Sequence, residues 1–247
     1  MRLTLRHTYD FGAEAARLGP DLVRPGSWDA LRETTGLFGL PRTRAEWEAR
    51  AAAPELAGRA RDIAAIVARL EARTICSHGV GTAALELRVL RAAPGARLVC
   101  TDFAPRTVAR LRALFPEADV RVHDLVHEEP PEADLHLMHR IDTELTDSEW
   151  RIVFPRFRTG TILFVPGLLL TWAEAARELA RRIRAPRATR AGYLRSADAL
   201  RALWAPSHQD ARGTVGELSA FLLTPRRELP PPRARPRHRR DAGGAAG

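Results

Sequence analysis

The sequence predicts one α/β domain built around a mostly parallel, seven-stranded sheet with an antiparallel last strand. Three observations carry this prediction. Short apolar segments alternate with amphipathic ones from residue 73 onward. Three capping boxes, beginning at Thr43, Thr146 and Thr171, mark helix starts. Two closely spaced apolar segments end the pattern and predict an antiparallel hairpin. With 247 residues, the chain can bury a large core without disulfides.

The elements follow from the spacing of the apolar residues. Strands are expected at 73–77, 97–101, 120–123, 134–138, 161–165, 207–212 and 217–224. Helices are expected over 55–72, from the glycine turn to 91, over 105–115, after Thr146, after Thr171 and over 196–204. In the helix after Thr171, we expect Trp172, Ala175, Leu179 and Ile183 to face the core. The predicted organisation is a helical N-terminal cap (1–54), the α/β domain (55–225) and a disordered tail rich in arginine and proline (226–247).

The composition excludes several chemistries. All 39 basic side chains of the Lys and Arg type are arginines, and the chain has no asparagine. It therefore lacks a phosphate-binding P-loop lysine, a Schiff-base lysine and the Tyr-x-x-x-Lys pair of many dehydrogenases. The formal net charge is +9, but much of the excess lies in the tail, so nucleic acid is not expected as a partner.

Cysteine usage and hydropathy bear on the location of the protein. Two cysteines, Cys76 and Cys100, each lie in an apolar segment, which indicates a reducing compartment. No signal peptide is evident, and the longest apolar stretch is interrupted by Pro166 and Gly167. We expect a cytoplasmic protein, a monomer or homodimer, without a membrane partner.

The segment that carries the functional argument is the turn after the first sheet strand. Gly79 and Gly81 separate this strand from a helix, and glycines allow both positive φ and close approach of a ligand. The helix N-terminus adds free N–H groups. Asp102 ends the next strand, 21 residues beyond Gly81, which suits an acid that binds ribose hydroxyls. Asp124 ends the third strand. The carboxyl ends of parallel strands meet at one edge, so these groups predict a nucleoside-sized site.

On these residues the chain resembles the class I S-adenosylmethionine-dependent methyltransferases over about residues 55–224. The resemblance implies a Rossmann-like three-layer sandwich, with S-adenosylmethionine as cofactor and in-line methyl transfer to a small-molecule acceptor. It implies that Gly79 and Gly81 approach the methionine half, Asp102 holds the ribose, Phe103 flanks the adenine and Asp124 faces the adenine amine. The expected cofactor-binding residues are Ser77, His78, Gly79, Gly81, Asp102, Phe103, Asp124 and Leu125.

The first motif departs from the family pattern, because Ser77 replaces an acid and Ala83 replaces a glycine. Candidate bases lie after the fourth strand: His139 and Asp142, with Glu144 as a weaker candidate. Two alternatives stay open: a non-catalytic pseudo-methyltransferase and an NAD(P)-dependent oxidoreductase. No metal site is predicted, because the segment that holds His123 is not expected to form a helix.

Overall fold

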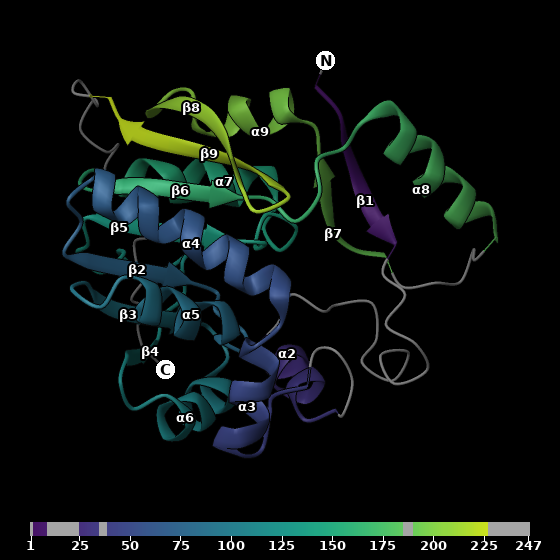
Figure 1. Cartoon of the computed structure of the whole chain (residues 1–247). Coiled ribbons are helices and arrows are strands. Elements are labelled where there is room, and N and C mark those ends of the chain that lie inside the picture. The colour runs from purple at the N-terminus through teal and green to yellow at the C-terminus, as the bar shows by residue number, and fades with distance from the viewer. Residues whose placement is uncertain (1, 9–24, 35–38, 185–189, 227–247) are drawn as a thin grey trace, which may run out of the picture.

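The computed structural model describes residues 2–8, 25–34, 39–184 and 190–226. Its centre is a seven-stranded sheet in the order β4-β3-β2-β5-β6-β9-β8 (Figure 1). The strands are β2 (Thr74–His78), β3 (Arg97–Asp102), β4 (Asp119–Val122), β5 (Leu135–His139), β6 (Thr161–Val165), β8 (His208–Val215) and β9 (Leu218–Pro225). The first five run parallel, and β9 is antiparallel to β6 and β8. The predicted sheet is confirmed.

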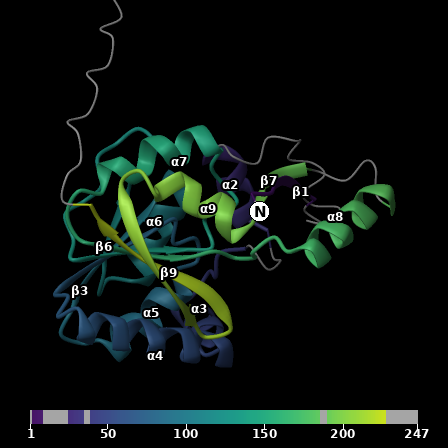
Figure 2. The ribbon, with the colours of Figure 1, turned by 90° about the horizontal axis from the view of Figure 1, so that it is seen from above.

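Helices cover both faces of this sheet. On one face, α4 (Pro54–Arg69), α5 (Ala84–Ala92) and α6 (Pro105–Leu114) enclose a core with Ile75, Leu98 and Leu135. On the other face, α7 (Asp147–Val153), the 3-10 helix η2 (Phe154–Arg156) and α9 (Ala197–Trp204) enclose a second, aromatic-rich core. Figure 2 shows α4 and α5 on the opposite side of the sheet from α7 and α9. The molecule is therefore a three-layer sandwich.

The helix boundaries follow the local signals in the sequence. Thr43 caps α3 (Arg44–Ala51) and Thr146 caps α7, and both form complete capping boxes. Ser196 caps α9 through the backbone N–H of Ala199. A short helix, α2 (Pro25–Arg32), precedes α3. None of the helices among the described residues is long and apolar enough to cross a membrane.

A separate two-stranded sheet joins the start of the described chain to the segment that precedes α9. It pairs β1 (Thr4–Thr8) with β7 (Arg190–Arg195) in antiparallel register, and it lies beside the main sheet (Figure 1). The sequence analysis did not predict β7, because its residues follow no alternating pattern. This pairing ties residues assigned to the N-terminal cap to the α/β domain.

The predicted orientation of α8 (Trp172–Arg184) is wrong. Trp172, Leu179 and Ile183 are 71%, 60% and 73% exposed, whereas Glu178 is fully buried. Glu178 lies within 3.5 Å of Arg181 and Arg182, and these ion pairs offset the cost of burying its charge. Helix periodicity identifies the apolar face of a helix, but it does not show which face packs against the rest of the protein. The predicted disordered tail lies outside the described residues, apart from Arg226.

Candidate functional site

The turn after β2 lies where the strand order reverses, between β2 and β5. Gly79 and Gly81 have φ values of 62° and 57°, and Ala83, before α5, has 52°. Left-handed backbone is costly for residues with a Cβ, so this turn needs its glycines. A Cβ on Gly79 would lie 2.6 Å from Cγ2 of Ile141, a residue of the loop after β5. Ligands of open α/β sheets bind at such a reversal.

Asp102 connects this turn to the next strand. One carboxylate oxygen, Oδ2, accepts the backbone N–H of Gly81 at 3.0 Å, and Oδ1 accepts that of Ala104 at 3.0 Å. The side chain is 6% exposed, and burial raises its pKa while these two hydrogen bonds lower it. The predicted convergence of Gly81 and Asp102 is therefore present. Each oxygen retains lone-pair capacity for a further donor.

Ser77 stands where the resembling family has an acid, and a buried carboxyl lies against it. Its hydroxyl donates to Oε1 of Glu86, in the first turn of α5, at 2.8 Å. Burial raises the pKa of Glu86 to about 7, and the nearby charge of Asp102 adds to the increase. The carboxyl is thus supplied from the helix rather than the strand. Sequence reasoning missed Glu86, although an acid among apolar residues was a signal.

A cluster over the glycine turn consists of Arg32, Trp28 and Glu144. Of these, only Glu144 was a candidate from the sequence, as a general base. The Arg32 guanidinium is close enough to Gly81 that a Cβ there would lie 2.6 Å from it. Arg32 interacts electrostatically with Asp102 and Glu144, and its guanidinium lies 5.0 Å from the Trp28 ring. Burial raises the pKa of Glu144 to about 7, with hydrogen bonds to Thr143 and Trp28 opposing the shift. The site therefore contains a cation and an acid near neutrality.

Asp142 and His139 occupy different surroundings. Asp142 is 2% exposed, and its Oδ1 accepts the N–H of Gly167 at 2.7 Å. Burial raises the pKa of Asp142 to about 6. His139 lies near Arg59 of α4, and burial together with the charge of Arg59 lowers its pKa to about 3. Among the residues that the structure describes, neither side chain forms a hydrogen bond with the glycine turn.

Arg195, at the end of β7, is a structural clamp. It is 1% exposed and donates to Oδ1 of Asp147 at 2.8 Å, to the carbonyl of Asp142 at 2.5 Å and to that of Leu145 at 2.6 Å. These three bonds hold the loop between β5 and α7, which includes Glu144. Arg195 thereby positions the candidate base without facing a ligand.

The remaining predicted cofactor residues are not all directed at the turn. Asp124 accepts from its own turn, including the N–H of Val126 at 2.9 Å, and its carboxylate pairs with His127 at 2.8 Å. Leu125 packs against the aromatic-rich core. Phe103 directly follows Asp102 and is partly exposed. His78 points away from Ser77, because successive strand side chains alternate between faces.

Comparison with solved structures shows similar folds. The fold is that of the class I S-adenosylmethionine-dependent methyltransferases, as the sequence resemblance implied. Human N-acetylserotonin methyltransferase in complex with SAM is similar at 19% identity over 83% of this chain and 57% of that one, with a TM-score of 0.58. The mitomycin 7-O-methyltransferase gives 16% identity, 87% and 76% coverage, and a TM-score of 0.53.

A methyltransferase of calicheamicin biosynthesis, in its SAH-bound form, gives 26% identity over 67% of this chain and 54% of that one, with a TM-score of 0.50. The chain thus spans between about half and three quarters of the length of these three relatives. No protein-family model matches the sequence, and the search of curated proteins gave no match.

Proposed function

We propose that this chain binds S-adenosylmethionine at the turn after β2 and transfers its methyl group to a hydroxyl of a small molecule. The observation that carries the proposal is the bond between Gly81 and Asp102 at the reversal of strand order. The fold adds support, since similar structures are solved with SAM or SAH. The bound cofactor would supply an electrophilic methyl group on a sulfonium sulfur.

The residues of the site fit this cofactor. The glycines place no Cβ at the turn, where Arg32 and Ile141 lie close by, and Asp102 has lone pairs for ribose hydroxyls. We assign Arg32 to the methionine carboxylate, because guanidinium groups bind carboxylates bidentately. The Ser77–Glu86 pair lies beneath the turn and would stand in for the missing acid.

Glu144 is the residue we favour as general base for the acceptor hydroxyl. Its pKa of about 7 lies near the working pH, where a base is most effective. Glu144 also interacts electrostatically with Arg32, which in turn interacts with Asp102. His139 and Asp142 stay candidates, although His139 lies near Arg59 and Asp142 accepts a hydrogen bond from Gly167. Positioning of the two reactants would contribute the larger part of the rate.

A second candidate function, that of a non-catalytic pseudo-methyltransferase, is favoured by one observation. The Arg32 side chain lies directly over Gly81 and pairs electrostatically with Asp102, which is where a ligand is expected. If Arg32 permanently covers the turn, Arg32→Ala will bind the cofactor while the unaltered chain will not.

The experiment is calorimetric titration of the purified chain with S-adenosylmethionine, S-adenosylhomocysteine and NADH. We expect heat from the first two only. S-adenosylhomocysteine release is then measured with a panel of hydroxylated aromatic compounds. Glu144→Gln should lower turnover by about 100-fold or more while cofactor affinity changes little, as general bases contribute about 10²–10⁴-fold. Glu132→Gln, on an exposed loop, is the matched control. Binding of NADH alone, or equal turnover of both variants, would contradict the proposal.

A further inference from the structure

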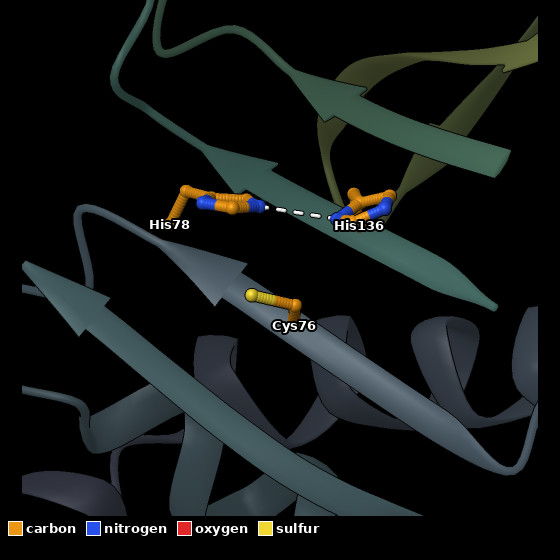
Figure 3. Close-up of side chains that lie close together, drawn as sticks. All are labelled: Cys76, His78 and His136. Atoms are coloured by element: carbon orange, nitrogen blue, oxygen red, sulfur yellow. Dashed lines mark hydrogen bonds between the residues drawn. The ribbon is translucent and has the colours of Figure 1, made fainter. Parts of the chain in front are cut away.

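A cluster of soft, nitrogen- and sulfur-bearing side chains lies beneath the glycine turn. Cys76 and His78 belong to β2 and His136 belongs to the neighbouring β5 (Figure 3). Cys76 and His136 are direct partners in the register of the two strands, and His78 lies two residues along on the same face. One ligand atom from each residue lies within 4.8 Å of the other two. All three side chains are at most 2% exposed.

One nitrogen of each ring faces the other ring, and the second nitrogen of each ring has a hydrogen-bond partner of its own. Nε2 of His78 and Nδ1 of His136 are 3.2 Å apart, as Figure 3 shows. The other nitrogen of His78 lies 3.2 Å from Oγ1 of Thr101, and His136 also bonds to the backbone of Thr159. The Thr101 hydroxyl can donate instead to the carbonyl of Ser77, at 3.3 Å. In that arrangement Nδ1 of His78 donates to Thr101 and His136 donates to the backbone of Thr159. The two nitrogens that face each other, Nε2 of His78 and Nδ1 of His136, then both carry lone pairs.

This pattern is the one that metal-binding histidines show. Such a histidine donates its second N–H to a carbonyl or another oxygen, which fixes its tautomer and orientation. Thr101 and the Thr159 backbone have that role here. Without a metal, the Thr101 proton can point at His78, and a proton of His78 then bridges to His136. One hydroxyl rotation therefore allows both states.

The distances suit a tetrahedral zinc ion. Zn–N bonds of about 2.0–2.1 Å and a Zn–S bond of about 2.3 Å place ligand atoms roughly 3.4–3.6 Å apart. The two nitrogens are already 3.2 Å apart. The Cys76 sulfur lies within 4.8 Å of both nitrogens, so it would have to move by at most about one ångström. Thiolate and imidazole ligands select zinc and related metals over magnesium or calcium.

A third histidine, His123, directly follows β4 and lies next to His78, outside the set of three close ligand atoms. Nδ1 of His123 is buried and has no hydrogen-bond partner, while its Nε2 lies 3.0 Å from the carbonyl of Glu129. The His123 and His78 rings are 5.9 Å apart between centroids. The edge of Phe157 packs against His78 and His136, so the cluster is enclosed by an apolar wall.

We propose that Cys76, His78 and His136 together bind a zinc ion. The ion would cross-link β2 to β5 at the point where the strand order reverses. His78 directly precedes Gly79, so the ion would also fix the start of the glycine turn. Sequence spacing could not reveal this site, because its ligands come from two different strands that are far apart in the sequence. A buried site of this kind is expected to load as the chain folds.

The test uses the full chain, freed of metal by unfolding with a chelator and refolded with zinc or cobalt. We expect one equivalent of zinc to bind and to raise the melting temperature, because a ligand that binds only the folded state stabilises it. With cobalt we expect the thiolate-to-cobalt charge-transfer absorption of a tetrahedral site. Absence of stoichiometric zinc binding or of that absorption in the unaltered chain overturns the proposal.

Cysteine variants locate the site. Cys100, also buried but on β3 beside Ser77, points to the opposite face and is the matched control. Cys76→Ala should abolish the cobalt charge-transfer absorption and weaken zinc more than the roughly 10–100-fold typical of losing an outer partner. Cys100→Ala should retain both. Equal metal binding by the two variants overturns the assignment. Should Cys76→Ala fail to fold, His136→Gln with the cobalt spectrum decides in its place.

Discussion

The conformation of Gly79 yields the sharpest prediction about the turn. Gly79→Ala places a Cβ on a residue with φ of 62°, and that Cβ would be 2.6 Å from Cγ2 of Ile141. Left-handed backbone costs an L residue about 1–2 kcal/mol, and overpacking adds about 1–3 kcal/mol. The expected loss in unfolding free energy is therefore about 2–5 kcal/mol. Gly95→Ala, at a position with open space around the added Cβ, should change stability by less than about 1 kcal/mol.

The assay is denaturant unfolding of the single variants and of a double variant with Ile141→Ala. In the Ile141→Ala background the added Cβ no longer clashes with the side chain of residue 141. The loss in unfolding free energy caused by Gly79→Ala should therefore fall to the part that comes from the left-handed backbone, about 1–2 kcal/mol. A loss below about 0.5 kcal/mol for Gly79→Ala, or an identical loss in both backgrounds, would refute the reasoning.

Three further predictions follow from the loop and the buried acids. Arg195→Lys should lower the free energy of unfolding by about 3–5 kcal/mol, because a lysine cannot make the three hydrogen bonds that the buried guanidinium donates in different directions. A loss below about 1 kcal/mol in thermal or denaturant unfolding would contradict the assignment of Arg195 as a clamp. The pKa of Asp142 is raised to about 6, so the folded chain holds this proton where the unfolded chain has lost it. Its stabilising contribution should fall by about 3 kcal/mol as pH rises from about 4 to 6, and Asp142→Asn should remove this slope from the stability profile. Ser77→Ala deprives Glu86 of its donor and should raise the Glu86 pKa above about 7, measured by carboxyl NMR titration; an unchanged pKa would contradict the pairing.

The sheet could be predicted because local signals and apolar periodicity agree along most of the chain. Thr43 and Thr146 each start a helix through bonds within four residues, so the sequence alone suffices. Asp102 could be placed because strand ends share an edge of a parallel sheet. These features depend on short-range geometry or on a topology rule.

The parts that could not be predicted depend on long-range packing. Arg32 reaches Gly81 from a helix about fifty residues earlier, and no spacing rule connects them. The face that α8 buries was predicted from hydropathy, but the structure buries Glu178 with arginine partners instead. The β1–β7 pairing joins residues almost two hundred positions apart. Each needs the three-dimensional arrangement to be known.

The central claim is that Asp102 and the glycine turn bind the cofactor. It is tested by calorimetric titration of S-adenosylmethionine into Asp102→Asn and into the control Asp124→Asn, whose carboxylate is engaged in its own turn. Hydrogen bonds to a charged group contribute about 1.5–3 kcal/mol, so Asp102→Asn should weaken affinity by about 10–100-fold. Asp124→Asn should weaken affinity by less than about threefold, a small fraction of the same energy scale. Equal affinities for the two variants, or no binding by the unaltered chain, would contradict the account.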